Sequence, residues 1–358
     1  MIKIDGSFLE GGGQIVRTAV AFSVLTNTAV KIVKIRKGRS KPGLKNQHLN
    51  AINALAELSN ATVIGARLGS TSLEFFPRQL IYRNLNIDIG TAGSITLLFQ
   101  ALMPVLLFSN KIIKIGVKGG TDTKYSMPID YFKSVFLPQL SKYAKISCKL
   151  EKRGYYPKGG GKFELTIKPK YSIRDFKSFS DFFKFLRSEE NRINLIDQNE
   201  LVLIKGVSHA SKDLMKANVA ERQAKNADYL LGQYKPVKIE IGYVDSLSVG
   251  SGVTLWAIFS QTEEVDQNNP VILGADSLGE KRKKAEIVGQ DAANNLIRLI
   301  KSEAAVDKYL ADQLLPYMAL FGGQIKVSEI TNHTKTNMKI IEEFIDMKFK
   351  KRKNIIRI

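Results

Sequence analysis

His333 is the side chain with the best prospect of nucleophilic chemistry, because the chain holds only three histidines. It lies in the polar run 331–337, between a predicted strand and a predicted amphipathic helix over Met338–Met347 with Thr336 or Asn337 as N-cap. Loops between a strand and a helix often carry reactive side chains. A single histidine is nevertheless more often structural than catalytic, so the motif alone leaves both roles open.

A glycine-rich turn near the N-terminus has the composition of an anion site. Gly11, Gly12 and Gly13 precede a predicted helix over 14–25, and backbone N–H groups at such a helix start approach anions closely. Gln14 and Arg17 are three residues apart and face the same way. Glu10 fits beside a phosphate only if a divalent cation lies between them. A plain tight turn remains the alternative, and no Walker A loop occurs in the chain.

A basic loop over 36–48 is the second candidate for phosphate binding. Arg36 and Arg39, with three lysines, flank glycine and proline ahead of a helix predicted to begin near Leu44. The planar guanidinium matches phosphate oxygens in bidentate fashion, so this loop is suited to grip a terminal phosphate. An ordinary basic surface loop is the other interpretation. His48, in the predicted helix, is expected to be structural or to make a polar contact.

Two further glycine turns, over 119–128 and 155–161, are expected to be a polar turn and a hairpin turn, although the tyrosines of the second could stack on a base. No C-x-x-C, H-E-x-x-H or G-x-S-x-G motif occurs in the chain, which favours phosphate chemistry with bound Mg²⁺ or Mn²⁺. Cys148, the one cysteine, is expected to be a small core residue in a reducing cytosol.

The net charge of +20 favours polyanionic partners but does not choose among RNA, DNA, nucleotides and anionic lipid, and a solvated cationic surface is also compatible. The longest apolar run, 95–108, is too short and interrupted to span a bilayer. The first residues read as a strand rather than a secretory signal. We therefore expect a soluble, cytoplasmic protein without membrane contacts; its oligomeric state stays open.

The pattern of elements repeats along the chain. A strand, a glycine turn and an apolar helix occur at 2–25 and again at 85–108, and a third unit is predicted from a helix over 283–301, a helix over 312–320 and a strand over 324–330. This pattern predicts an α+β fold of repeated units. The composition changes after 172, so we expect a large domain over 1–175 and 280–358 and an inserted α/β domain over 176–279. The basic tail at 348–353 is expected to be a solvated end or an RNA contact.

Taken in order, these segments resemble the RNA 3′-terminal phosphate cyclase family. The matching stretches are DGSFLEGGGQIVRTA (5–19), RKGRSKPGLKNQHL (36–49), GTAGSITLLFQALMP (90–104), GGTDTKYSMP (119–128), YYPKGGGKFEL (155–165), YLADQLLPYMAL (309–320) and NHTKTN (332–337). The match is poorest over 172–205. The resemblance implies three α/β units with helices on four-stranded sheets, as in the enolpyruvyl transferases, and a smaller α/β insert. It also implies a reaction that uses ATP and an RNA 3′-phosphate and yields AMP, pyrophosphate and a 2′,3′-cyclic phosphate.

The resemblance assigns roles to particular residues. His333 corresponds to the histidine that becomes adenylated, and Glu10 to the acidic residue that helps to hold the metal. Tyr309 and Pro128 would enclose the adenine. The remaining ATP contacts would be Gln100, Leu310, Ala311, Asp312 and Gln313, and the phosphate- and RNA-binding residues Arg17, Arg36, Arg39 and Gln47. Two relatives of similar architecture are the alternatives: a non-catalytic ribosome-assembly protein, which lacks the histidine, and an enolpyruvyl transferase, which needs no ATP.

Overall fold

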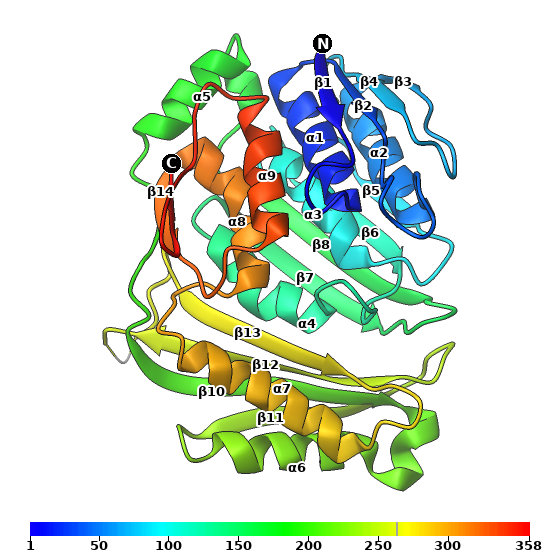
Figure 1. Cartoon of the computed structure of the whole chain (residues 1–358), viewed down its shortest axis with the longest axis vertical. Helices are drawn as coiled ribbons and strands as arrows, with labels where there is room; N and C mark the ends of the chain where they lie inside the picture. The colour runs from blue at the N-terminus through cyan, green and yellow to red at the C-terminus, as the bar shows by residue number, and fades with distance from the viewer. Residues whose placement is uncertain (263) are drawn as a thin grey trace.

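The chain forms an α+β structure with four mixed four-stranded sheets, each packed with helices (Figure 1). The computed structural model describes residues 1–262 and 264–358. Three sheets build one body, and the fourth lies beside it with two helices on its outer face (Figure 1). None of the helices over the described residues is long and apolar enough to cross a membrane.

The first two sheets share strand order and direction. In each, the first two strands are parallel and the other pairs antiparallel. The first sheet has the order β1-β2-β4-β3, from β1 (Ile2–Asp5), β2 (Val30–Val33), β3 (Thr62–Ile64) and β4 (Leu73–Phe76), with helices α1 (Gly13–Thr26) and α2 (Asn46–Ser59). The second has the order β5-β6-β8-β7, from β5 (Leu85–Asp88), β6 (Ile113–Gly119), β7 (Ala144–Lys152) and β8 (Gly161–Pro169), with helices α3 (Ile95–Leu106), α4 (Ile129–Tyr131), η1 (Phe132–Phe136) and η2 (Leu137–Leu140).

The third sheet repeats this arrangement with strands that are far apart in the sequence. Its order is β9-β14-β16-β15, from β9 (Ile193–Leu195), β14 (Gly323–Lys326), β15 (Lys350–Arg352) and β16 (Ile355–Arg357), with helices α8 (Lys308–Phe321) and α9 (Asn332–Glu342). β9 and β14 are parallel, and the other pairs are antiparallel. The basic tail, predicted as a charge run, forms the exposed edge strand β15.

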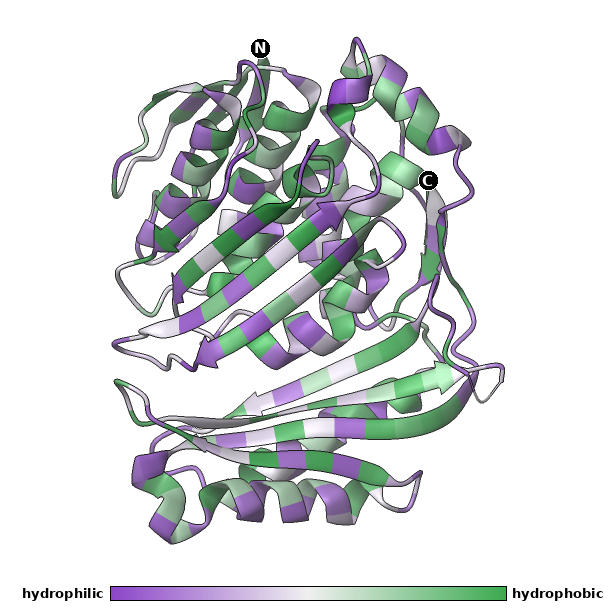
Figure 2. Ribbon diagram, turned by 180° about the vertical axis from the view of Figure 1, so that it is seen from behind, coloured by the Kyte–Doolittle hydropathy of each residue, from purple (hydrophilic) through white to green (hydrophobic). Residues whose placement is uncertain are grey.

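The fourth sheet has the order β11-β10-β12-β13, from β10 (Glu200–Ser211), β11 (Val237–Val244), β12 (Ser251–Ser260) and β13 (Val271–Leu278). Its helices are η4 (Lys212–Ala217), α6 (Val219–Leu231) and α7 (Ala285–Ile300), and two more helices, η3 (Ile173–Asp175) and α5 (Phe179–Ser188), precede it in the chain. Burial alternates along strands such as β6 and β8, as expected when one face of a sheet is buried, and Figure 2 shows the matching alternation of hydropathy. By contrast, β12 and β13 of the fourth sheet are buried at nearly every position.

The packing differs from the predicted boundaries at 176 and 279. β9 lies within the predicted insert but pairs with β14 of the third sheet, and α5 packs against α8. The first of the two helices predicted for the third unit, over 283–301, is observed as α7, which packs on β12 and β13 beside α6. Its buried residues Val288, Ala292 and Leu296 recur every four positions and form the stripe that covers this sheet. We therefore infer that the inserted unit runs from β10 to α7.

The helices of the large body meet in its centre. α1 packs against α2, α3 and α9, and α8 packs against α9. Because α1 and α3 have neighbours on several sides, nearly all their residues are buried, which explains why both read as almost continuously apolar. The start of α1 and the start of α9 meet at the candidate site.

Candidate active site

His333 lies in the first turn of a helix rather than in a loop. α9 begins at Asn332, and Thr331 is its N-cap, with its hydroxyl accepting a hydrogen bond from the Thr334 backbone N–H at 3.1 Å. The predicted helix start at Met338 was therefore wrong, as were Thr336 and Asn337 as N-caps. The error arose because the first turn has no apolar stripe.

Buried polar side chains replace apolar packing in that first turn. The Thr18 hydroxyl donates to Asn337 Oδ1 at 2.6 Å, and the Asn337 amide donates to the Asp312 carbonyl at 2.8 Å. Thr334 and Thr336 are also fully buried. These bonds tie α9 to α1 and α8, and thereby place His333 over the glycine turn that precedes α1.

The hydrogen bonds of His333 determine which ring nitrogen is free. Its Nδ1 lies 2.9 Å from Gln14 Oε1, and an amide oxygen can only accept, so Nδ1 carries the hydrogen. The lone pair is then on Nε2, which lies 3.5 Å from Glu10 Oε1. Partial burial lowers the pKa of His333, and Arg17 and Arg39 lower it further against the opposing effect of Glu10. At neutral pH the imidazole is therefore uncharged.

The glycine turn is shaped by close contacts. Gly12 is the N-cap of α1, and Gly11 has a φ of +55°, which glycine adopts without strain. A Cβ on Gly13 would lie 2.0 Å from His48 Nε2, so only glycine fits there. His48 is buried and its Nδ1 accepts from the Lys45 backbone N–H at 3.0 Å, as expected for a structural histidine.

A cavity of about 390 Å³ opens beside His333. This is the size range of small-molecule sites. Five of the residues predicted to bind ATP or phosphate line it together with His333: Arg17, Gln100, Tyr309, Asp312 and Gln313. The other lining residues are Gln14, Leu97, Tyr125, Ser126, Met127, Tyr131 and Asp276. Pro128 directly follows the lining residue Met127 and is the N-cap of α4.

Two other residues predicted to contact ATP are buried in α8 and do not line the cavity. Leu310 and Ala311 are fully buried in α8. The start of α8 is held by Asp307, whose carboxylate accepts from the backbone N–H groups of Tyr309 and Leu310 at 2.9 and 3.0 Å and from the Tyr131 hydroxyl at 2.7 Å. This capping fixes the backbone that carries Tyr309.

Two ionisable groups of the cavity wall, Arg17 and Asp312, are largely buried. Arg17 Nε donates to Gln100 Oε1 at 3.1 Å, which orients the guanidinium. Burial raises the pKa of Asp312 to about 7, and its Oδ1 has no hydrogen-bond partner among the described residues. A buried polar atom without a partner is costly, so it is available to a polar ligand.

The predicted phosphate residues of the basic loop occupy different positions. Arg39 forms an ion pair with Glu10, which lies beside His333. Arg36 donates to the carbonyls of Lys41 and Gly43 at 2.8 and 2.9 Å and so holds the loop itself. Gln47 lies in the first turn of α2, outside the cavity lining. The binding roles of these residues and of Arg17 stay predictions.

Two groups of carboxylates could be considered for a metal. Glu10 lies 3.5 Å from His333 Nε2 and is paired with Arg39. Asp122, Asp130 and His209 form a buried cluster. Arg153 lies 3.2 Å from Asp122 and 2.6 Å from Asp130, so its guanidinium already balances the carboxylates there. Both sites are thus already paired with an arginine, and the metal-binding role of Glu10 stays a prediction.

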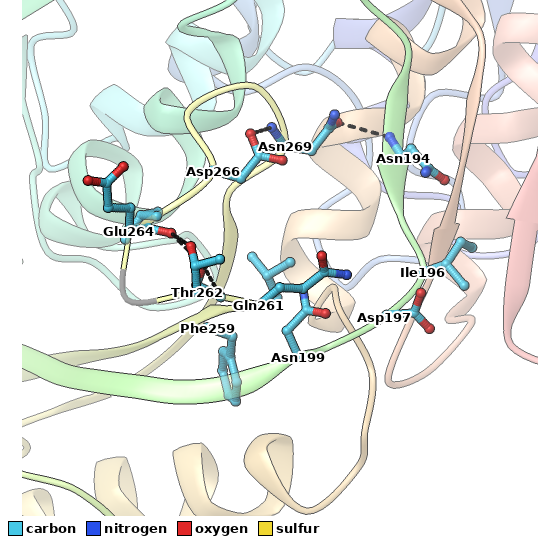
Figure 3. Close-up of a pocket in the computed structure, with 13 residues that line it drawn as sticks. Asn194, Ile196, Asp197, Asn199, Phe259, Gln261, Thr262, Glu264, Asp266 and Asn269 are labelled. Atoms are coloured by element: carbon cyan, nitrogen blue, oxygen red, sulfur yellow. Dashed lines mark hydrogen bonds between the residues drawn. The ribbon is translucent and has the colours of Figure 1, made fainter.

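A second cavity, of about 420 Å³, lies between the β9–β10 connection and the loop joining β12 to β13 (Figure 3). It is lined by amides and carboxylates, and none of its described lining residues is a cation. Asp266 accepts from the Asn269 backbone N–H, and Asn269 Oδ1 accepts from the Asn194 backbone N–H at 3.0 Å. Phosphate ligands therefore favour the His333 cavity.

Sequence reasoning missed several residues of the site. Gln14 was grouped with Arg17 as a phosphate contact, whereas it is also the hydrogen-bond partner of His333. Tyr125 lines the cavity with its side chain almost fully exposed. Asp276 reaches the cavity from β13 of the inserted unit, and burial raises its pKa to about 7. Nothing in the sequence connects Asp276 with the other residues, because it lies in a separate sheet.

Comparison with known proteins is consistent with this geometry. The family model described as RNA 3′-terminal phosphate cyclase matches residues 8–351. A protein of that name from Pyrococcus abyssi is 41% identical over 351 residues, which cover 98% of this chain and 94% of the relative. One from Pyrobaculum aerophilum is 44% identical over 354 residues, with coverage of 97% and 94%. One from Sulfurisphaera tokodaii is 41% identical over 352 residues, with coverage of 97% and 95%.

Proposed function

Because the chain belongs to the RNA 3′-terminal phosphate cyclase family, we propose that it uses ATP to convert an RNA 3′-phosphate into a 2′,3′-cyclic phosphodiester through a covalent adenylate on His333. The observation that carries the mechanism is the pair of contacts made by the imidazole. Gln14 holds the hydrogen on Nδ1, and the lone pair of Nε2 is directed to the mouth of the cavity beside Glu10.

In the first step, His333 Nε2 attacks the α-phosphorus of ATP. A nitrogen–phosphorus bond forms, the bond from the α-phosphorus to pyrophosphate breaks, and pyrophosphate leaves with its electron pair. The ring gains positive charge, and its Nδ1–H remains donated to Gln14. Covalent catalysis of this kind divides a difficult displacement into easier steps.

In the second step, an oxygen of the RNA 3′-phosphate attacks the adenylyl phosphorus. The nitrogen–phosphorus bond breaks, and neutral His333 is restored. In the third step, the neighbouring 2′-hydroxyl attacks the RNA phosphorus, AMP leaves, and the hydroxyl proton passes to water. This last step is intramolecular, so proximity supplies much of the rate.

The cavity residues support these steps. Tyr309 and the segment at Met127 and Pro128 would enclose the adenine, and Arg17 would stabilise negative charge on the ATP phosphates. Arg39, which lies outside the cavity lining, would act on the RNA 3′-phosphate. Glu10, together with phosphate oxygens, would hold Mg²⁺ or Mn²⁺, which supplies charge stabilisation when bound. The three similar sheets of the large body support repeated units like those of the enolpyruvyl transferases, interrupted after β9 by the inserted unit.

The deciding experiment is incubation of the protein with α-labelled ATP and Mg²⁺, followed by a chase with a 3′-phosphorylated oligonucleotide. We expect acid-labile label on the wild-type protein and its transfer to RNA on the chase. His333→Ala should carry no label and retain the circular dichroism of the wild type. A wild-type protein that never gains the mass of AMP would refute the mechanism and favour a non-catalytic relative.

A further inference from the structure

We propose that the inserted unit binds the RNA backbone upstream of the reacting 3′ end, in a basic groove between the start of β12 and the starts of α6 and α7. This inference rests on the proposed function, because it takes the RNA substrate from there. The groove encloses about 540 Å³ and is separate from the His333 cavity. Its walls include the segment 279–285, which we call the basic segment, together with residues from the first turn of α6.

The basic segment carries cations that no carboxylate neutralises. Lys281, Arg282 and Lys284 are exposed, and none of them has an ion-pair partner in the described part of the chain. The neighbouring Lys283 is different, because it is paired with Asp291 at 2.7 Å. Three unneutralised cations gathered around a hollow repel one another and attract a polyanion.

The backbone adds to this positive potential. α7 begins at Ala285, directly after the basic segment, and α6 begins at Val219 on the opposite wall. The two helices pack side by side, and Arg222 of α6 pairs with Glu286 of α7 at 2.7 Å, which holds their starts together. The positive ends of two helix dipoles therefore face the same groove as the three cations.

The groove adjoins the rim of the ATP cavity. Glu280, the first charged residue of the basic segment, pairs with Lys124 at 3.0 Å, and the next residue, Tyr125, lines the His333 cavity. Asp276 lines the His333 cavity as well, and it is only three residues before Gly279, which lines the groove. One short stretch of chain thus connects the two hollows.

This adjacency identifies the ligand. The RNA 3′ end must reach Nε2 of His333, and the nucleotides before it must leave the cavity across its rim. Tyr125 offers an exposed aromatic ring on that rim, with 98% of its surface accessible, suited to stack on a base. Beyond it, the basic segment offers sequence-independent contacts to phosphodiesters, as in single-strand binding proteins.

The test compares two triple variants that remove the same charge. The groove variant carries Lys281→Gln, Arg282→Gln and Lys284→Gln. The control variant carries Lys350→Gln, Lys351→Gln and Arg352→Gln in β15, an equally exposed basic strand of the third sheet. Fluorescence anisotropy with a 3′-phosphorylated RNA of about 15 nucleotides, and with a trinucleotide, measures binding as a function of salt.

We expect the groove variant to bind the longer RNA on the order of tenfold more weakly at about 0.1 M salt. The slope of log Kd against log salt should fall by about 2, because each of three lost single-strand phosphate contacts contributes roughly 0.7. Trinucleotide binding and self-adenylation should stay unchanged, and the control variant should match the wild type. Equal weakening in both variants, or none in the groove variant, overturns the proposal. Because binding is measured without turnover, a wild type that fails to self-adenylate refutes the proposed reaction but leaves the groove testable.

Discussion

Gln14 should control the nucleophile through its hydrogen bond to His333. The bond is 2.9 Å long, and the Gln14 side chain is nearly fully buried, so water cannot replace it readily. A hydrogen bond between neutral groups contributes about 1 kcal/mol, and one to a charged group about 1.5–3 kcal/mol. The imidazole becomes charged as Nε2 attacks, so the bond strengthens by about 0.5–2 kcal/mol in the transition state.

Gln14→Leu should therefore slow self-adenylation by roughly 2- to 30-fold. Without the acceptor, the ring hydrogen can also move to Nε2 and remove the lone pair that attacks. The assay is single-turnover transfer of label from α-labelled ATP, with thermal unfolding as a control for stability. Adenylation of Gln14→Leu at the wild-type rate would contradict the assignment of Nδ1 as donor.

Gln14→Glu tests the same bond through its pH dependence. The nucleophile must be neutral, and burial lowers the pKa of His333 below its usual value of 6.5, so wild-type adenylation should decline only below pH 6.5. A carboxylate at position 14 would stabilise the protonated ring and raise the pKa. The acid limb of the pH–rate profile should then move to higher pH, and an unmoved limb would refute the reasoning.

Two further predictions concern the mouth and the frame of the cavity. Arg39→Ala should impair transfer of AMP to a 3′-phosphorylated oligonucleotide more than self-adenylation, because Arg39 lies outside the cavity lining. The two steps are measured in separate assays, and equal losses in both would count against this role. Asp307→Ala should lower the free energy of unfolding by about 2–4 kcal/mol, because the start of α8 and the Tyr131 hydroxyl lose their acceptor. Urea unfolding measures this, and a loss well under 1 kcal/mol would show that the cap is dispensable.

The long apolar helices could be predicted from the sequence because their signal is local. Helices predicted over 14–25 and 95–108 are observed as Gly13–Thr26 and Ile95–Leu106. Glycine or serine marks their starts, and nearly all residues between are buried. The grouping of Arg17 with the ATP residues and His333 followed from the resemblance, and the cavity contains them together.

The start of α9 and the limits of the inserted unit could not be predicted in this way. The polar turn around His333 is helical because Thr331 caps it through Thr334 and because Asn337 bonds to α1 and α8, and no local pattern reveals the contacts to the other helices. The Lys- and Phe-rich segment before β9 reads as irregular, yet Phe182 stacks edge-on against Phe108 at 5.0 Å between ring centroids. That contact joins residues that are far apart in the sequence.

The separation of β9 from β14 has a consequence for synthesis on the ribosome. β9 emerges as a bare strand, and its partner is made only after the whole of β10 to α8 has followed. Domains generally fold as units from the N-terminus onwards, so the inserted unit has time to fold while β9 still presents an open edge. His333, the proposed nucleophile, lies in α9, which is translated later still, so we expect the nascent chain to be inactive until α9 has been made.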